Sequence, residues 1–433
     1  MFQRYRNIPL IKRILVGIVI GVILGVTLPS VTAINIMGEL FVGALKAIAP
    51  LLVFMLILSA VSKYESGAKN HFSSVVTMYI AATLVAALAA VGASYIFKVH
   101  LLFPTAAKVA SGAPQDLGKV ITDLLTNAVS NPIAALVNAS YLTILFWGLI
   151  IGFGLRNAKA GTKQVINDFS HTIEMTAQFI IEFAPFGIIG LLHNSIATTG
   201  FAGIARYGQL VLLLVGTMVF TYLVIYSFMV WLMTHQNPFP LVLWTLKVSG
   251  IPAFFTRSSA VNIPVNMQAC EDLGLNEKSY AVSIALGGTA NSGGAAITVS
   301  IMTLAAANTL GIHVSFPLAL LLCILSAVSA TGSSGIAGGS LLLIPMAASL
   351  FGINNDIAMQ VVAIGFIIGV IQDSVETAVN SASDLLFTAT AEYHDLMKEG
   401  HPVDIKAAIQ HADAKRNHAD ADKEVAGSAA EAE

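Results

Sequence analysis

Apolar stretches and short polar segments alternate along the first half of the chain. Six of these stretches come close to the roughly 20 residues that a helix needs to cross a bilayer. They predict membrane helices at residues 14–31, 38–62, 73–97, 130–155, 172–196 and 207–234. Basic residues lie in the loops at 63–69 and 156–163, which the positive-inside rule assigns to the cytoplasm. The amino terminus is then cytoplasmic as well, and the long connection at 98–129 is external.

The second half of the chain differs in composition. Three segments are rich in Gly, Ser, Thr and Asn: TRSSAVNIP at 256–264, GGTANSGGAA at 287–296 and SATGSSGIAGGS at 329–340. Only one charged residue, Asp356, lies between Lys278 and Asp373, so these segments are expected to stay at membrane depth. Unpaired backbone groups are tolerated there only where protein, an ion or a ligand satisfies them.

The order of these segments predicts a repeat. A re-entrant hairpin followed by a helix is expected twice, and the first of the two helices is expected to be broken at 287–294. The elements are a hairpin at 238–268, a helix at 279–306, a hairpin at 314–350 and a helix at 357–393. Two such pairs favour inverted repeats around a binding site at the membrane midplane.

The last of these helices carries the most informative pattern. Residues 364–393 are mostly apolar, yet five polar residues share one face at about 100° per residue. They are Asp373, Glu376, Thr377, Asn380 and Asp384. A carboxylate in the hydrocarbon region is costly unless it faces a partner, an ion or water. The stripe therefore predicts a site for a cation and a small polar solute.

Ion pairs between helices are the alternative explanation for these carboxylates. Arg257 is the only nearby cation, and it could pair with Glu376 or with Asp373, leaving at least one acid for a ligand. Asp384 is our candidate for a direct sodium ligand, because it is a hard oxygen anion with Asn380 one turn before it. The Gly-rich segments are either close-packing or flexible elements, or they offer carbonyls to a cation and N–H groups to a carboxylate.

Composition agrees with a polytopic helical membrane protein. The 433 residues are 56% hydrophobic and 11% charged, with a mean hydropathy of +0.79; soluble domains carry about 25% charged residues. The net charge of -2 does not suggest nucleic-acid binding. Cys270 and Cys323 are far apart in apolar surroundings, which favours buried thiols over a disulfide. The polar residues from about 395 onward predict a cytoplasmic tail that is partly disordered.

Enzyme functions find little support. The Gly-rich runs do not match the GxxxxGK[ST] phosphate loop, and no histidine lies between residues 236 and 312 to act as a base for the serines there. A channel is the stronger alternative to a carrier, but it would need a continuous polar path through the membrane.

At these motifs the chain resembles the dicarboxylate/amino acid:cation symporter family, which includes the glutamate transporters. TRSSAVNIPVNM is similar to the serine-rich first hairpin of that family, and GGTANSGG to the unwound part of its seventh helix. TGSSGIAGGS is similar to the second hairpin, and DSVETAVNSASD to the ligand stripe of the eighth helix. The resemblance implies an all-α fold of eight transmembrane helices with two re-entrant hairpins, a homotrimer, and an elevator mechanism.

The resemblance also implies a division into domains. Residues 1–234 would hold six transmembrane helices, mostly scaffold and trimer contacts, with the third and sixth helices in the mobile transport domain. Residues 235–394 would form the transport core, and residues 395–433 a cytoplasmic tail. The protein would be a multi-pass component of the bacterial inner membrane, in contact with lipid and with both termini in the cytoplasm.

Two sets of site residues follow from the resemblance. The substrate set is Ser258, Ser259, Ile336, Gly339, Asp373, Glu376, Thr377 and Asn380. The sodium set is Gly287, Asn291, Asn380 and Asp384 for one ion, and Thr289, Ser292, Ala330, Thr331 and Ser333 for another. No organic cofactor is implied.

The implied roles are specific. Asp373 would receive the substrate ammonium, while Asn380 and the backbone of Ser259 would bind its α-carboxylate. Thr377 would lie near the substrate side chain, and backbone at 336 and 339 would close a lid. The Asp384 carboxylate would bind one sodium together with main-chain carbonyls.

Four departures from the family pattern shape the expected substrate. Glu376 stands where acidic-substrate members have an arginine, and Ala295 where they have a helping threonine. Gly293 replaces the aspartate of the NMDG signature, and Ala82 a threonine that supports the same sodium site. They predict a sodium-driven symporter of small neutral amino acids, specifically serine and threonine, with one or two coupled sodium ions. The alternative is a sodium- or proton-coupled symporter of acidic amino acids or dicarboxylates that uses Arg257 instead, and an ion channel comes third.

Overall fold

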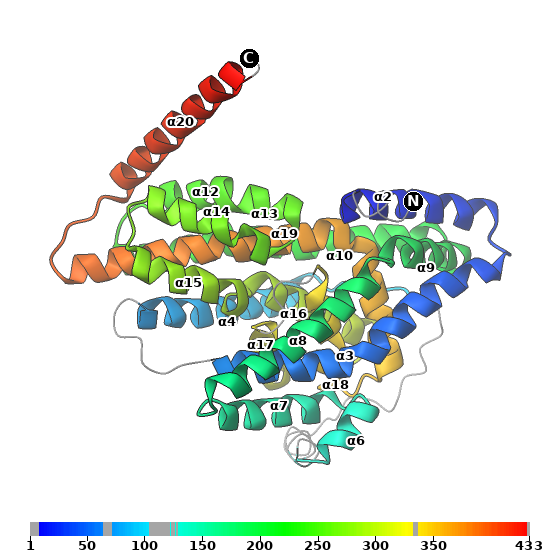
Figure 1. The fold of residues 1–433 in the computed structure, drawn as a ribbon. Coiled ribbons are helices and arrows are strands. Elements are labelled where there is room, and N and C mark those ends of the chain that lie inside the picture. The colour runs from blue at the N-terminus through cyan, green and yellow to red at the C-terminus, as the bar shows by residue number, and fades with distance from the viewer. Residues whose placement is uncertain are drawn as a thin grey trace.

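The computed structural model describes residues 8–63, 72–103, 122, 126, 129–331 and 337–430, and every regular element in this part is helical (Figure 1). The first half contains α2 (Leu10–Thr27), η1 (Thr32–Ile34), α3 (Asn35–Lys63), α4 (Phe72–Ile96), α6 (Pro132–Val137), α7 (Tyr141–Leu155), α8 (Ala160–Ile181), α9 (Ala184–Thr199), α10 (Phe201–Phe220), η2 (Thr221–Tyr226) and α11 (Ser227–Thr234). The second half contains α12 (Phe239–Thr245), η3 (Leu246–Gly250), α13 (Ile251–Thr256), α14 (Ser259–Asp272), α15 (Glu277–Ala290), α16 (Gly293–Thr309), α17 (Phe316–Ala330), η4 (Gly339–Leu343), α18 (Ile344–Ser349), α19 (Asn355–Lys398) and α20 (Ile405–Ala430).

The chain has the helices of a multi-pass membrane protein. Among the described residues, 7 helices are long and apolar enough to cross a membrane, and the pair α8–α9 would make up to 8. The predicted spans at 14–31, 38–62 and 73–97 correspond to α2, α3 and α4, and the span at 207–234 to the run α10–η2–α11. The predicted class, an all-helical membrane protein, is confirmed.

One predicted span crosses a bend. The sequence predicts a single helix at 172–196, but α8 ends at Ile181 and α9 begins at Ala184, with 52° between them. Pro185 explains the bend, because proline lacks a backbone N–H and its ring clashes with the preceding helical turn. The predicted span at 172–196 is therefore part of a bent helix pair and not one continuous helix.

The predicted span at 130–155 is also wrong as one helix. The triplet Asn138, Ala139 and Ser140 separates α6 from α7, and Ala139 has a left-handed backbone with φ 52°. The 15 residues of α7 reach only about 22 Å at 1.5 Å per residue, which is less than the roughly 30 Å hydrocarbon core. Helix α7 is thus too short to cross a membrane alone.

The chain reverses direction between α13 and α14. Arg257, at the reversal, has a left-handed backbone with φ 54°. Asn262 of α14 donates its side-chain amide to the carbonyl of Ser249 in η3 at 3.2 Å, so the two arms lie side by side. We call residues 239–272 the first hairpin. The predicted break in the next helix is confirmed at residues 291–292, between α15 and α16.

Helix α19 runs through the middle of the second half and packs against α4, α10, α13, α14, α15, α16 and α18.

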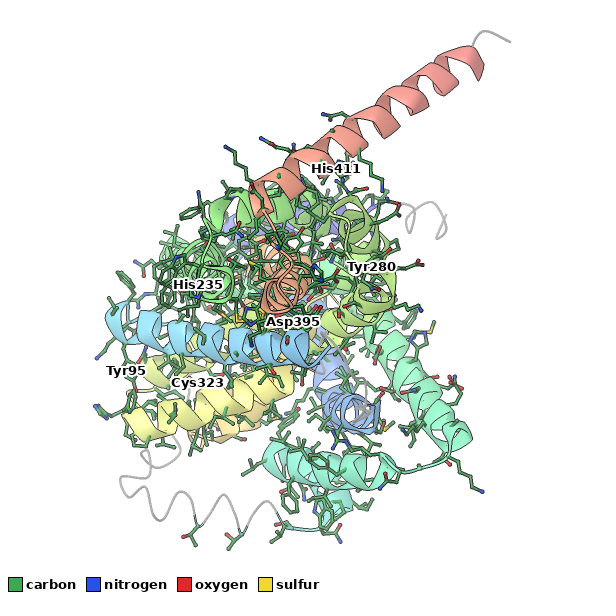
Figure 2. All side chains as sticks on the ribbon, turned by 90° about the vertical axis from the view of Figure 1, so that its left-hand side faces the viewer. Tyr95, His235, Tyr280, Cys323, Asp395 and His411 are labelled. Atoms are coloured by element: carbon green, nitrogen blue, oxygen red, sulfur yellow. The ribbon has the colours of Figure 1, made fainter. Side chains whose placement is uncertain are left out.

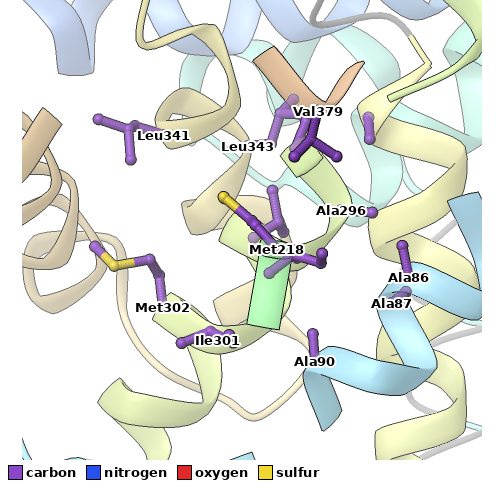
Figure 3. Packing of buried hydrophobic residues seen from close by; sticks show 14 of the residues in the cluster. Ala86, Ala87, Ala90, Met218, Ala296, Ile301, Met302, Leu341, Leu343 and Val379 are labelled. Carbon is purple, nitrogen blue, oxygen red and sulfur yellow. The ribbon is translucent and has the colours of Figure 1, made fainter. Parts of the chain in front are cut away.

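Cys270 and Cys323 are buried and free, as predicted, and Figure 2 shows Cys323 on α17 near Tyr95 of α4. Helix α4 packs on α16, where Ala86, Ala87 and Ala296 are buried (Figure 3). Small side chains let two membrane helices approach closely, which increases their van der Waals contact.

The tail differs from the prediction. A partly disordered segment was expected, but residues Ile405–Ala430 form α20, and α19 continues to Lys398, past its predicted end at 393. The first turns of α20 lie on α12 and α14, and the rest leaves the helical body (Figure 1). Ile405, Ile409 and Ala412 are buried and share one helix face, which explains the helix as an amphipathic one.

Candidate functional site

Helix α19 buries the whole polar stripe. None of Asp373, Glu376, Thr377, Asn380 and Asp384 is more than 7% exposed. Their spacing along one helix places them in a row beside the first hairpin, the α15–α16 break and the segment that starts at Gly338. Burial makes each charge depend on its partners, because an ion removed from water must recover its solvation from neighbouring groups.

Asp373 is paired with Arg257. The Nε and Nη2 atoms of Arg257 each lie 2.7 Å from Oδ2 of Asp373, and the Gly338 backbone N–H donates to Oδ1 at 3.0 Å. The sequence left open whether Arg257 pairs with Asp373 or Glu376, and the structure selects Asp373. Within the described part of the chain, Nη1 of Arg257 is buried without a hydrogen-bond partner. One guanidinium donor therefore stays available beside the stripe.

Glu376 is surrounded by neutral donors instead. Oε2 accepts hydrogen bonds from Thr298 Oγ1 at 2.6 Å, Ser340 Oγ at 2.9 Å and Gln372 Nε2 at 2.6 Å. No described residue donates a hydrogen bond to Oε1. Thr298 lies almost one helical turn after Ala295, so a hydroxyl still reaches this region of α16 although Ala295 has none.

Asp384 and Asn291 meet at the helix break. Asn291 donates its side-chain amide to Oδ1 of Asp384 at 2.9 Å, and it lies 3.4 Å from the carbonyl oxygen of Asn380. A Cβ placed on Gly287 would lie 2.8 Å from Oδ1 of Asp384, so the carboxylate rests directly on the backbone of α15. The structure thus brings together Gly287, Asn291, Asn380 and Asp384. One carboxylate among amide and main-chain oxygens suits a hard cation.

Tyr79 of α4 contacts the helices that carry Asp384 and the α15–α16 break. Its hydroxyl lies 3.1 Å from the backbone oxygen of Asp384, 3.2 Å from that of Ser283, and 2.9 Å from Thr388 Oγ1. These contacts tie α4 to α15 and α19, so the third long helix is part of the unit that carries the stripe.

The tip of the first hairpin presents backbone donors. Ser258 caps α14, with its Oγ accepting the Val261 N–H at 3.3 Å, and Ser259 is the first residue of the helix. The N–H groups of a first helical turn have no partner within the helix and can bind an anion.

The two neutral residues of the stripe also have partners. Asn380 accepts the Gly294 N–H on Oδ1 at 2.7 Å, which turns its NH₂ group toward other partners. Thr377 donates to the carbonyl of Asp373 at 2.7 Å.

The second predicted sodium set uses main-chain carbonyls, and its two threonine side chains have other contacts. Thr289 donates its hydroxyl to Leu286 O at 3.0 Å, and Thr331 donates to Val328 O at 2.7 Å, each within its own helix. Ser292 is buried in the break, and its Oγ lacks a hydrogen-bond partner among the described residues. Ala330 is buried at the end of α17 and Gly339 begins η4. Ser333 and Ile336 lie outside the described residues.

A polar cluster behind the stripe was missed by the sequence analysis. Asn262 donates to Ser381 Oγ at 2.7 Å, Asn266 donates to Ser381 O at 3.0 Å, and Ser249 Oγ lies 3.2 Å from Ser381 Oγ. The cluster holds both arms of the first hairpin on α19. Two asparagines one turn apart in an apolar helix were the available signal, and Gln372, one turn before Glu376, was another.

Gly293 lies under the hydroxyl of Tyr226. A Cβ built on Gly293 would collide with Tyr226 Oη, which the π-helical turn η2 directs at this point. Tyr226 is fully buried, and its hydroxyl has no hydrogen-bond partner among the described residues. The space that a side chain at 293 would need is thus filled by a residue from another helix.

The Arg257–Asp373 pair can be tested through stability. Arg257→Gln or Asp373→Asn should each lower the unfolding free energy by about 3–5 kcal/mol, because each leaves one buried charge without its partner. The double variant should lie closer to the native protein, since neither charge remains. Thermal unfolding of the purified protein in detergent measures this.

The exposed pair Lys46–Asp356 supplies the control for that experiment. Asp356→Asn should change the unfolding temperature little, because exposed ion pairs contribute about 0–1 kcal/mol. Single variants at Arg257 and Asp373 that unfold at the native temperature would show that the pair does not stabilise the fold.

Comparison with known proteins agrees with this geometry. The profile of the sodium:dicarboxylate symporter family matches residues 10–393. The serine/threonine transporter SstT of Lacticaseibacillus paracasei is 67% identical over 95% of this chain and 94% of its own length. The transporters of the same name from Enterococcus faecalis and Streptococcus thermophilus are 56% and 52% identical, over 94% and 88% of this chain and 97% and 95% of their own lengths. The chain belongs to the sodium:dicarboxylate symporter family.

Proposed function

We propose that this protein is a sodium-coupled symporter that imports serine and threonine across the bacterial plasma membrane. Its family is one of cation-coupled symporters, so the protein is a transporter rather than an enzyme. The bacterial relatives named above carry the name serine/threonine transporter. The observation that carries the substrate assignment is Glu376, a buried carboxylate to which the described residues supply only neutral donors.

Glu376 favours a substrate hydroxyl. Its Oε2 is occupied by three protein donors, and Oε1 is left for a donor from the substrate. The hydroxyl of serine or threonine can donate to that oxygen. The side-chain carboxylate of aspartate or glutamate would instead meet a like charge in surroundings of low dielectric.

The remaining substrate contacts follow from the donors that the protein leaves open. The Ser259 N–H, the Asn380 NH₂ group and Nη1 of Arg257 would bind the α-carboxylate. Asp373 would add the substrate ammonium to its existing contacts with Arg257 and Gly338. Thr377 would lie near the side chain, and the backbone at 336 and 339 would close the site.

Charge balance supports a coupling cation and a low stoichiometry. The stripe holds three carboxylates and Arg257 supplies one positive charge, so two negative charges remain if all are ionised. A zwitterionic substrate adds no net charge, so two sodium ions would restore neutrality and one would leave a single negative charge. The first would bind at Asp384 with Gly287, Asn291 and Asn380, and the second near Thr289, Ser292, Ala330, Thr331 and Ser333. Tyr226 filling the space over Gly293 argues against a further cation there.

We also propose the architecture implied by the resemblance. Residues 1–234 would supply most of a trimeric scaffold, with α4 and α10–α11 joining the transport core at 235–394. The contacts of Tyr79 with α15 and α19 support including α4 in that core. The segments at 238–268 and 314–350 would enter the membrane as hairpins from opposite sides, and the core would move as an elevator.

Topology provides a separate test. In a variant without native cysteines, a cysteine replacing Gln410 should react with an impermeant maleimide only from the cytoplasmic side. A cysteine replacing Gln115 should react only from outside, because the basic loops at 63–69 and 156–163 place the 98–129 connection there. External labelling of the residue 410 variant in intact cells would mean that the number of spans is wrong by one.

Uptake into liposomes tests the substrate. Purified protein should accumulate labelled serine and threonine when a sodium gradient is imposed, and should exclude aspartate. Two like charges about 4 Å apart repel by about 4 kcal/mol at an effective dielectric constant of about 20, which is roughly a thousandfold in affinity. Glu376→Arg should abolish serine uptake, whereas Glu399→Gln, which removes a carboxylate outside the stripe, should leave it unchanged. Aspartate uptake at the rate of serine would favour the acidic-substrate alternative, and flux without accumulation would favour a channel.

A variant at Asp384 tests the proposed sodium site. Asp384→Asn should reduce sodium-driven uptake at least tenfold, because the proposed ion would lose its only anionic ligand while neutral oxygens alone must offset its dehydration. Asp356→Asn is the matched control, since Asp356 is exposed and outside the stripe. The unfolding temperature should remain native in both. Reversal-potential measurements in vesicles should give one or two sodium ions per substrate, and a value of three would contradict our interpretation of Gly293.

A further inference from the structure

The first turns of α20 are docked on the first hairpin. Ile405 and Ala412 are no more than 1% exposed, and Ile409 is buried on the same face. The helices that they cover are α12 and α14, which are the two arms of the first hairpin at the end away from its tip. Figure 2 shows α20 at this end of the molecule, with His411 on it. The apolar contact explains why the tail docks, and the polar contacts around it define where.

One turn of α20 contacts both arms. Trp244 of α12 donates its indole N–H to Asp413 Oδ1 at 3.0 Å. Arg416, three residues after Asp413, donates from Nε to Asp272 Oδ2 of α14 at 2.6 Å, and its guanidinium carbon lies 5.6 Å from the centre of the Trp244 ring. Asp413 and Arg416 therefore connect α12 with α14 across the base of the hairpin.

Asp272 needs this contact. It is only 3% exposed, although it is the last residue of α14, where the helix dipole disfavours an anion. Arg416 and Lys415 supply its positive charges, and Gln268 adds a hydrogen bond at 3.2 Å. A hydrogen bond to the carboxylate of Glu271 raises the pKa of Lys415, so this lysine stays protonated to a higher pH than usual. The cations that compensate a buried carboxylate of the hairpin thus come from the tail.

A second anchor fixes the connection between α19 and α20. Gln236, just before α12, donates from Nε2 to the carbonyl of Val403 at 2.6 Å and accepts the N–H of Ile405 on Oε1 at 3.2 Å. The connecting segment is therefore held to the start of the first hairpin. Through this segment the end of α19 is joined to the hairpin base.

We propose that α20 is an internal strap: Asp413 and Arg416 hold the two arms of the first hairpin together and thereby position Arg257, Ser258 and Ser259 against α19. The 14 residues of α14 place the strap about 21 Å from the tip, at 1.5 Å per residue. Splaying of the arms at the base would shift the tip, where Arg257 meets Asp373. Asp413 and Arg416 are positioning residues, since they contact neither the substrate nor the ions.

Hydrogen–deuterium exchange of the full-length protein tests the strap without any transport assay. Arg416→Gln should accelerate exchange of the amides in residues 239–272 about tenfold, because a hydrogen bond to a charged group is lost. Trp244→Phe, which keeps an aromatic ring and removes the indole N–H, should act in the same direction. Lys406→Gln, an exposed residue on the same helix, is the control and should exchange as the native protein does. Native exchange rates in the Arg416→Gln hairpin would overturn the proposal, as would equal acceleration in α3 and α9.

The double variant Asp272→Asn/Arg416→Gln separates a strap from a mere charge effect. It removes the ion pair without leaving an unpaired buried carboxylate. If the strap holds the arms, exchange in 239–272 stays fast in the double variant. Recovery of native exchange would mean that Arg416 only neutralises Asp272, and the proposal would be wrong.

The consequence for transport rests on the proposed function. A displaced tip should weaken substrate binding, so Arg416→Gln should raise the KM for serine several-fold with a smaller change in the maximal rate. An unchanged KM combined with fast hairpin exchange would overturn the positioning role. Absence of serine uptake by the native protein would instead overturn the proposed function, while the exchange experiment would still decide the strap.

Discussion

Three carboxylates on one buried helix face are the constraint around which the second half of this protein is organised. Asp373, Glu376 and Asp384 are each at most 6% exposed on α19. A buried charge is tolerated only with a counter-charge, hydrogen bonds or an ion. Each carboxylate therefore requires partners from another part of the chain. The hairpin tip, the segment after Gly338, and the break between α15 and α16 all contact this face because donors are needed there.

The three carboxylates are compensated to different degrees, and that difference separates their roles. Asp373 has a full counter-charge from Arg257 and a backbone N–H. Glu376 has three neutral donors on one oxygen. Among the described residues, the Asp384 carboxylate accepts one hydrogen bond, from the side-chain amide of Asn291. The least compensated carboxylate is the one with most to gain from a cation, whereas the well-compensated Asp373 fixes the tip of the hairpin.

Sequence reasoning found the features that depend on local pattern. The polar stripe on 364–393 and the break at 287–294 follow from helix periodicity and from residue types that weaken helices, and both are present. It failed where a distant residue decides the structure. The sequence did not decide whether Arg257 pairs with Asp373 or Glu376, because these two acids lie within one turn of each other on the same helix face. The contacts of Thr298 and Ser340 with Glu376 were missed for the same reason, since they depend on how α16 and η4 pack on α19.

Other errors have local causes that hydropathy does not weigh. Pro185 bends the predicted span at 172–196, and the left-handed Ala139 divides the one at 130–155. An average over about 20 residues hides one such position. The polar composition of the tail predicts partial disorder. Its buried apolar residues at 405, 409 and 412 nevertheless stabilise a helix, because they pack on the base of the first hairpin. Three apolar residues at helical spacing predict a docked helix only when the surface that they pack against is known.

Gly293 shows how the loss of a side chain should be interpreted. The resemblance implies that Gly293 removes a carboxylate ligand, but the sequence does not say what fills the space above the glycine. In the structure the hydroxyl of Tyr226, from the π-helical turn η2, stands over that glycine. A buried hydroxyl without a protein partner is a neutral dipole, and it cannot replace the charge that a dehydrated cation requires. With the Tyr226 hydroxyl packed over Gly293, this position contributes packing and no charged side chain.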